Sequence, residues 1–398
     1  MIPAGTYVLD PLEVATGLVI GLGPELELVG RPRAAESPLQ ALERAVLPAL
    51  QRAPCLVSFS GGRDSSAVLA VATAVARREG LPLPVPATNR FAGAPAANES
   101  EWQERVVSHL GLDEWIRLEH GDELDCVGPV ATDVLRRHGL VWPFNAHFHV
   151  PLLRQAAGGS MLTGVGGDEL LAPSRWARAL DVLHRRQRAQ LKDVLRIALA
   201  FAPAAVRKRV LRRRLPLRYA WLRPNALRTF TDAWATQSAA DPADWAAHFG
   251  WVRRLRYIQV GAASLRTLAA DEDVTLVQPF LDPGFSDALA SLPPTERFGT
   301  RGEAMQALFG ELLPEATVTR SVKTVFDEVF WGEPSRSFAA GWNGAGVDGE
   351  LVDRDALAGE WAAAEPDPRS FLLLQAAWLA QRGRSADRLE QALDGVGQ

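Results

Sequence analysis

The sequence has few of the residues from which disulfide scaffolds, metal clusters and membrane anchors are built. Only two cysteines occur, Cys55 and Cys126, which excludes a disulfide framework and any CxxC metal or redox site. The residues that follow Met1 carry no basic region, and no apolar run is long enough to span a bilayer. We therefore expect a cytoplasmic protein without a membrane span. The hydrophobic share of 47% and the charged share of 23% are typical of a globular protein.

The small net charge of −4 hides an uneven distribution. Residues 175–228 contain 16 lysines and arginines but only two acids, Asp181 and Asp193, so this segment carries +14 and the rest carries −18. The basic residues lie among leucines at helical spacing, which favours a solvated helical face. The alternative is a docking surface for an acidic peptide or a carrier protein. Nucleic acid binding is disfavoured, because nothing else in the chain supports base recognition.

The order of the patterns predicts three regions. Residues 1–50 are expected to form a small β-rich lead-in, with strand candidates at 6–9, 17–21 and 25–29, followed by a helix from Ser37-Pro38 to Leu50. Residues 51–175 alternate strand and helix, which predicts a parallel sheet with ligands at the carboxyl ends of its strands. Residues 176–398 are dominated by helical patterns and are expected to complete the active site.

A glycine-rich turn follows the first strand of the alternating region. The segment 57–66 reads VSFSGGRDSS and leads directly into an apolar helix. Successive amides in such a turn, together with the positive end of the helix, make a site for phosphate or pyrophosphate. The lysine of a Walker loop is missing. The pattern instead resembles the SGGxDS pyrophosphate loop of N-type ATP pyrophosphatases. The candidate ligands of the nucleotide here are Ser58, Ser60, Gly61, Gly62, Asp64, Ser65 and Ser66.

A second glycine turn lies about a hundred residues downstream, where residues 163–169 read TGVGGDE. The two turns together resemble those of the synthetase domain of the asparagine synthetase family, which includes β-lactam synthetases and lasso-peptide cyclases. Two further segments extend the resemblance over roughly residues 38–335. Residues 278–282 read QPFLD and match the family's RxPFLD, and residues 320–326 read RSVKTVF and match its RxxKxxF.

The resemblance implies an α/β fold of the adenine nucleotide alpha-hydrolase type, similar to a Rossmann fold, followed by a largely helical region. It also implies an ATP- and Mg²⁺-dependent ligase that adenylates a carboxylate for attack by ammonia or an amine. Asp64 and Asp168 would then hold magnesium, with Gly166 and Gly167 completing the nucleotide site. Lys323 would be the catalytic cation near the α-phosphate, and Arg320 a weaker candidate for that role.

The sequence also departs from the family's pattern. Glutamine-dependent members begin with a catalytic cysteine at position 2 and a glutaminase domain, whereas this sequence has Ile2 and about fifty residues before the first turn. We expect no glutamine hydrolysis by that route. The family's glutamate base, four residues before the proline of PFLD, is replaced by Thr275. Glu272 is the candidate substitute if the backbone is helical, Asp271 and Asp273 compete for the role, and a solvated acidic loop is an equal alternative.

Several interpretations remain open at this level. The leading one is an amide-forming ligase acting on a small acid or a peptide carboxylate, with ammonia or an amine as the nucleophile, in natural-product or peptide lactam biosynthesis. The alternatives are asparagine synthesis from aspartate with ammonia, a tRNA-modifying N-type ATP pyrophosphatase, and a non-catalytic homologue that serves as a scaffold. His147 and His149 form an HxH pair that zinc would accept, but a packed or solvated pair is favoured because no third ligand is nearby. The acid, the amine and the oligomeric state are not determined by the sequence.

Overall fold

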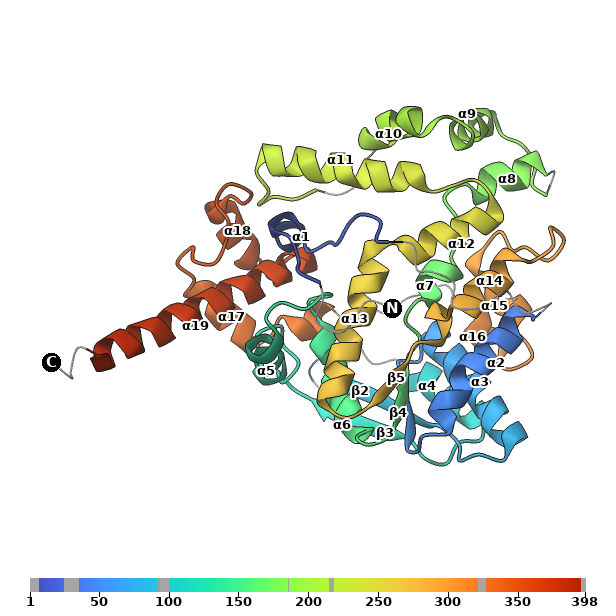
Figure 1. Ribbon diagram of the computed structural model, residues 1–398, viewed down its shortest axis with the longest axis horizontal. Helices are drawn as coiled ribbons and strands as arrows, with labels where there is room; N and C mark the ends of the chain where they lie inside the picture. Colours follow the sequence, from blue (N-terminus) through green and yellow to red (C-terminus); the bar gives the residue numbers. More distant parts are fainter. Residues whose placement is uncertain are drawn as a thin grey trace.

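A parallel five-stranded sheet lies among the helices of the chain (Figure 1). The computed structural model describes residues 7–24, 36–91, 93, 100–184, 186–214, 218–320 and 327–394, of which 327 and 383–394 are described by their backbone alone. The strand order is β3-β2-β1-β4-β5, and all neighbouring strands are parallel. The strands are β1 (Cys55–Ser58), β2 (Val85–Phe91), β3 (Ile116–His120), β4 (Ser160–Leu162) and β5 (Thr275–Val277).

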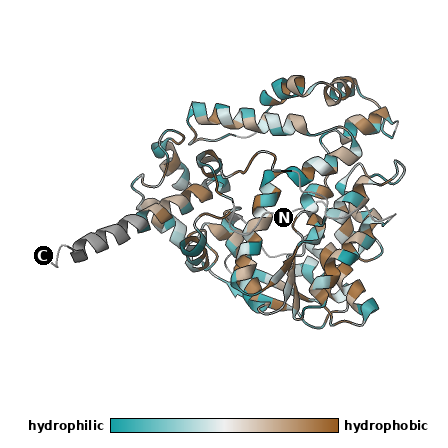
Figure 2. Cartoon of the chain, viewed as in Figure 1, coloured by the Kyte–Doolittle hydropathy of each residue, from teal (hydrophilic) through white to brown (hydrophobic). Residues whose placement is uncertain are grey.

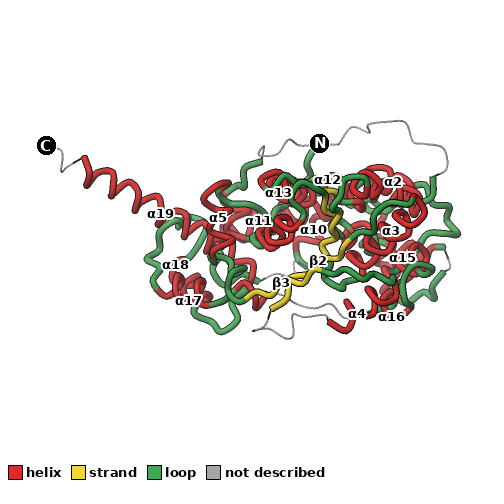
Figure 3. Tube along the Cα trace, turned by 90° about the horizontal axis from the view of Figure 1, so that it is seen from below, coloured by secondary structure: helices red, strands yellow, loops and turns green. Residues whose placement is uncertain are grey.

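Helices cover both faces of this sheet, as Figure 3 shows from below, with α5 and α13 on one side and α3 and α15 on the other. The helices before residue 220 are α1 (Pro11–Thr16), α2 (Pro38–Leu50), α3 (Arg63–Glu79), α4 (Ser100–His109), α5 (Pro129–His138), η2 (Ala146–His149), α6 (Val150–Gln155), α7 (Gly167–Leu170), α8 (Ala177–Leu183), α9 (Leu191–Ala200) and α10 (Ala204–Arg212). Those after it are α11 (Pro224–Ala240), α12 (Trp245–Arg254), α13 (Arg256–Asp271), η3 (Pro279–Leu281), α14 (Pro283–Ala290), α15 (Arg301–Phe309), α16 (Glu315–Val318), η4 (Asp327–Phe330), α17 (Glu333–Ala340), α18 (Arg354–Trp361), η5 (Pro368–Ser370) and α19 (Phe371–Asp394).

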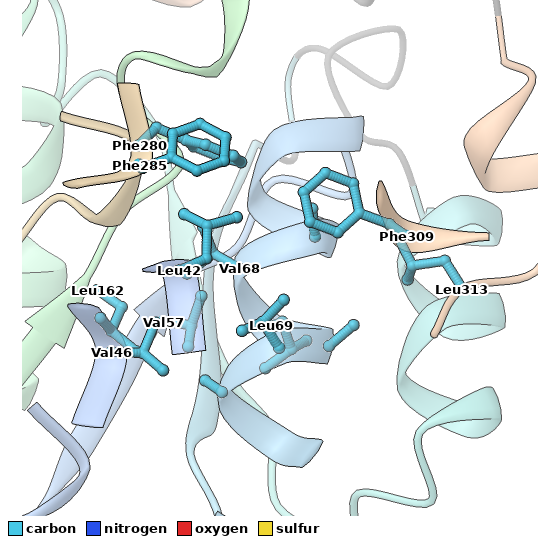
Figure 4. Packing of buried hydrophobic residues seen from close by; sticks show 14 of the residues in the cluster. Leu42, Val46, Val57, Val68, Leu69, Leu162, Phe280, Phe285, Phe309 and Leu313 are labelled. Carbon is cyan, nitrogen blue, oxygen red and sulfur yellow. The ribbon is translucent and has the colours of Figure 1, made fainter. Parts of the chain in front are cut away.

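The central strands are apolar on both faces because both faces are covered. In β1, Val57 joins the core beneath α2 and α3, whereas Leu56 joins the core beneath α6 and α13. Figure 4 shows the first of these cores, in which the side chains of Leu42, Val68 and Leu162 gather near Val57. Each fully buried side chain of this kind contributes about 1.5–3 kcal/mol to folding. In Figure 2 the strands of the sheet and the helices beside them carry many brown, hydrophobic residues.

The strand order places two loops side by side. From β1 the chain proceeds to β2 and β3 on one side and then returns to β4 on the other side of β1. The loops that follow β1 and β4 therefore lie together at a topological switch point, which is where ligands bind in open α/β sheets. The predicted fold class, a parallel α/β sheet followed by a largely helical region, is confirmed.

The prediction of a β-rich lead-in is wrong for the residues that the structure describes. No strand forms at 7–9 or 17–21, and residues 11–16 form helix α1. Asp10 caps that helix by accepting the amides of Leu12 and Glu13 at 2.8 and 2.9 Å, and Gly17 ends it with φ 66°. These local capping contacts outweigh the strand preference of the neighbouring apolar residues. The strand expected at 25–29 lies outside the described residues. The helix expected from residue 38 to residue 50 is present as α2.

The boundary expected at residue 175 does not separate the sheet from the helical region. Strand β5 comes from that region and pairs with β4, Thr275 opposite Ser160 and Val277 opposite Leu162. The sheet is therefore completed by a segment about a hundred residues beyond the second glycine turn. Within the part of the chain that the structure describes, no helix combines the length and the apolar character needed to cross a membrane.

Candidate active site

The first glycine turn forms a compact loop between β1 and α3. The amide of Phe59 donates to Ala87 at 2.8 Å, which extends the sheet to the edge of the loop. Gly61 then takes φ 85°, a left-handed conformation that favours glycine, and Gly62 precedes the first turn of α3. The hydroxyls of Ser60 and Ser65 lie 3.2 Å apart across the loop. The arrangement brings these hydroxyls close to the backbone amides at the N-terminus of α3, a helix of 17 residues. Such a combination of donors is what an anion site requires.

The second glycine turn is packed directly against the first. A β-carbon on Gly167 would lie 2.5 Å from Cγ of Asp64, and one on Gly164 would lie 2.7 Å from the amide nitrogen of Ser65. Gly166 has φ 97°, and a β-carbon there would lie 2.4 Å from Leu281. Only glycine permits these approaches. The two motifs therefore belong to one site, with the PFLD segment behind the second loop.

One arginine connects the two aspartates that the sequence nominates as magnesium ligands. Arg301, at the start of α15, places Nη2 2.6 Å from both carboxylate oxygens of Asp64, and its Nη1 donates to Oδ1 of Asp168. The structure thus brings Asp64 and Asp168 within reach of a single cationic group. Two carboxylates so placed also form the oxygen-rich environment that Mg²⁺ prefers.

Two further arginines surround the first loop. Arg320 is buried, donates to the carbonyl of Gly61 at 3.3 Å and lies over the ring of Trp102 at 4.8 Å. The pKa of Arg63 is lowered by its partial burial and, next in size, by the charge of Arg301. These guanidinium groups place positive charge beside the loop, next to the carboxylates that Arg301 contacts, and positive charge attracts a polyphosphate.

Two buried hydroxyls at the site point to a ligand. Ser66 Oγ in the first loop and Thr163 Oγ1 in the second have no hydrogen-bond partner among the residues that the structure describes. Buried polar groups in folded proteins are almost always hydrogen-bonded. Two buried hydroxyls without a described partner, next to the glycine loops, are therefore suited to donate hydrogen bonds to a phosphate group. Ser58, the last residue of β1, places its Oγ 3.4 Å from Nδ1 of His149. It therefore lies behind the loop and not in it.

Two predicted catalytic residues have different outcomes. Lys323 lies outside the described residues, so its role stays a prediction. Glu272 does not reach the site, and the prediction that it replaces the missing base is wrong. Helix α13 ends at Asp271, and the chain turns through Asp273, with φ 52°, into the start of β5. Glu272 therefore lies at the amino ends of the strands, where Arg154 donates to it at 3.1 Å, on the opposite edge from the two loops.

The histidine pair does not form a metal centre in the described part of the chain. His147 is buried, and its two ring nitrogens lie 2.9 Å from the carbonyl of Leu124 and 3.2 Å from that of Phe144. Among the residues that the structure describes, no group of three potential ligands is placed to hold a metal ion. The interpretation of a packed pair agrees with these contacts.

A cavity of about 350 Å³ opens beside both loops. Ser60 of the first loop and Gly166 of the second lie in its wall. The other lining residues come from the η2 region, from the second loop, from α13 and from η4, and they are Trp142, Pro143, Asn145, Ala146, Phe148, His149, Val165, Glu169, Tyr257, Ile258, Gly261, Ala262, Leu265 and Phe330.

Sequence patterns alone missed part of this site. Arg301 stands in no recognisable motif, and only its place at the start of a capped helix distinguishes it. Arg63 occupies the variable position of the SGGxDS motif, so the motif assigns it no role, and it is half-buried near the charges of Arg301 and Arg320. The walls of the cavity come from separate segments between Ser60 and Phe330, so no local pattern could indicate them.

Comparison with known sequences identifies the family to which these features belong. The family model described as asparagine synthase matches residues 39–379 of the 398 residues. The matched range includes both glycine loops, Arg301, Arg320 and the whole cavity wall. A comparison with curated proteins found no match.

Proposed function

Because the chain belongs to the asparagine synthase family, whose members are ligase-type synthetases that use ATP and Mg²⁺, we propose that it joins a carboxylate to ammonia or an amine with release of AMP and pyrophosphate. The observation that carries the proposal is the contact between the two glycine loops, which places Asp64 and Asp168 around one cationic group. A non-catalytic scaffold has no need of this arrangement.

The proposed reaction has two steps. An oxygen of the substrate carboxylate attacks the α-phosphorus of ATP, the bond between the α-phosphorus and the bridging oxygen breaks, and pyrophosphate leaves. The nitrogen of ammonia or an amine then attacks the acyl carbon, the acyl–oxygen bond breaks, AMP leaves and the nitrogen loses a proton. Protein groups would contribute mainly by positioning the reactants and stabilising charge.

The described residues support distinct roles in these steps. The amides and hydroxyls from Ser60 to Ser66 would cradle the β- and γ-phosphates at the start of α3. Arg63 and Arg320 would balance phosphate charge from either side of that loop. Arg301, which contacts both aspartates, would shift toward the phosphates when those carboxylates bind a metal ion.

The residues present also fit magnesium. Asp64 and Asp168 would hold it, and a bound Mg²⁺ would neutralise charge on the departing pyrophosphate. The fit rests on the convergence of two carboxylates on one positive group, next to hydroxyls that lack a partner among the described residues.

The proposal predicts which nucleotide products appear. Purified protein incubated with ATP, Mg²⁺, an amine donor and a panel of carboxylic acids should release AMP and pyrophosphate in equal amounts, and only when an acid is present. Chromatography of the nucleotides and an enzymatic pyrophosphate assay measure both. Release of ADP and phosphate would overturn the assignment, and so would AMP release that ignores the acid.

We further propose that the basic segment binds an acidic peptide or carrier protein that presents the carboxylate. Six of the eight strongly exposed large apolar side chains of the described residues lie in this segment, which Figure 1 shows along α8 to α11 at one edge of the molecule. They are Leu183, Leu191, Val194, Leu195, Phe201 and Val206. A merely solvated face would not expose so much apolar surface among its charges. Positive charge beside apolar side chains is complementary to an acidic, partly apolar partner.

Charge reversal should test this surface. Arg212, Arg213 and Arg214 are exposed, and their triple replacement by glutamate is expected to raise the KM for a macromolecular substrate by about 10-fold or more at low salt, because steering charges change sign. Adenylation of small acids should not change. A matched control reverses three exposed arginines elsewhere, Arg52, Arg78 and Arg336. Equal KM values for both triple variants, or a KM that ignores added salt, would remove the docking role.

A further inference from the structure

The cavity beside the loops has an apolar wall that phosphate binding does not explain. Ser60 and Gly166 in its wall belong to the two glycine loops, so whatever fills the cavity lies next to the phosphates of the proposed function. Its volume of about 350 Å³ is at the lower end of the range for small-molecule sites. The cavity can hold a side-chain-sized group and not a folded segment.

Aromatic contacts hold the wall in place. The rings of Trp142 and Tyr257 are 6.0 Å apart, and those of Phe148 and Phe330 are 6.1 Å apart. A β-carbon on Gly261 would lie 3.3 Å from the ring of Trp142, so glycine allows α13 to approach closely. The result is a preformed surface to which Ile258 and Leu265 add aliphatic groups.

A buried carboxylate fixes the part of the wall that comes from the C-terminal region. Asp125 accepts the amide of Gly332 at 2.6 Å and the hydroxyl of Ser335 at 2.6 Å. The amide of Cys126 also donates to the carbonyl of Phe330 at 3.0 Å. Phe330, which lines the cavity, is therefore held by a contact at its own carbonyl and by contacts of the residues that follow it, so this part of the wall is fixed by the fold.

The polar groups that the described residues contribute to the wall carry no positive charge. None of the described residues that line the cavity is a lysine or an arginine. His149 remains neutral near pH 7, because burial and, to a smaller extent, His147 lower its pKa to about 4. The carboxylate of Glu169 accepts a hydrogen bond from Tyr257, whose pKa is raised by burial and by that same charge. The part of the wall that the described residues form is therefore negative at Glu169 and largely apolar elsewhere.

We propose that this cavity binds the acid substrate and selects carboxylic acids whose remaining part is uncharged and apolar, such as an arylalkyl or aliphatic group. This assignment rests on the proposed function and adds the class of substrate. It excludes aspartate as the preferred acid, since the second carboxylate of aspartate would face Glu169 and an apolar wall. A charge buried without a partner lowers affinity by about 100-fold or more.

The test measures binding and chemistry separately. Isothermal titration of the protein, with Mg²⁺ and a non-cleavable α,β-methylene analogue of ATP, compares 3-phenylpropionate and hexanoate with L-aspartate and succinate. Apolar acids should bind at least about 10-fold more tightly than the two dicarboxylic acids. The same acids are then supplied with ATP, and AMP and pyrophosphate are measured.

Two variants locate the selection. Ile258 is half-buried on α13, so Ile258→Arg adds a cation to the wall and should reverse the preference toward aspartate and succinate, while Ile258→Leu should keep the original order. Circular dichroism confirms that both fold. Tighter binding of aspartate to the unmodified protein, no binding of the apolar acids, or an unchanged order in Ile258→Arg would each overturn the assignment. Apolar acids that bind as expected but yield no AMP would leave the assignment standing and refute the proposed function.

Discussion

Replacing either Asp64 or Asp168 by alanine is expected to reduce acid-dependent release of AMP and pyrophosphate by about 1,000-fold or more. Both carboxylates converge on the guanidinium of Arg301, so removing one leaves Arg301 with an unbalanced charge and would leave the Mg²⁺ of the proposed function with fewer oxygen ligands. Initial rates with saturating ATP and acid measure the loss. Thermal unfolding measured in parallel separates lost chemistry from lost stability.

Two comparisons make this experiment specific. Asp64→Asn keeps the shape of the side chain but not its charge, and should lose nearly as much activity as Asp64→Ala. Glu272→Ala removes a carboxylate at the opposite edge of the sheet and should keep activity within about 2-fold, as expected for an exposed ion pair with Arg154. A Glu272→Ala loss comparable to that of the aspartate variants would restore Glu272 as the base and contradict the site described here.

The parts of the fold that could be predicted from the sequence are those with dense local signals. The first loop combines an apolar strand, two glycines and an apolar helix within about twenty residues, and the structure places all three as expected. The second loop carries the same kind of signal. The adjacency of the two loops follows from strand order, because β1 and β4 are neighbours in the sheet and their loops leave it at one switch point.

The rest depends on contacts that no local pattern records. Strand β5 has three residues, too few to show an alternation of apolar and polar side chains, and it follows an acidic turn. The expectation that Glu272 replaces the missing base required a helical backbone up to β5. The helix does not continue that far, because Asp273 in a left-handed conformation turns the chain. Arg301 reaches Asp64 across more than two hundred residues, and a solitary arginine in a helix carries no signal of such a partner. The apolar walls of the cavity have the same long-range origin.

Lys323→Ala is expected to lower kcat by about 100- to 1,000-fold while changing the affinity for ATP by less than about 3-fold. The family resemblance assigns this lysine to the charge that develops at the α-phosphate and the acyl oxygen during the reaction, not in the ground state. Arg320, three residues earlier, is buried against the carbonyl of Gly61 in the first loop, so the RxxKxxF segment begins at the nucleotide site. Single-turnover rates give the chemical step, and binding of the non-cleavable ATP analogue gives the affinity.

The chain has three lysines, and this offers an internal control. Lys192 is exposed on α9, so Lys192→Ala removes an equal charge and should leave both kcat and ATP affinity unchanged. Lys323→Arg keeps the charge but spreads it over a planar group of different shape, and should recover only part of the rate if the cation must meet one oxygen atom. A loss of ATP affinity in Lys323→Ala with an unchanged single-turnover rate would instead make Lys323 a phosphate anchor, because an interaction made equally in ground state and transition state changes binding and not the chemical step. The charge in the transition state would then have to be balanced by the described arginines, Arg63, Arg301 and Arg320, which already surround the loop.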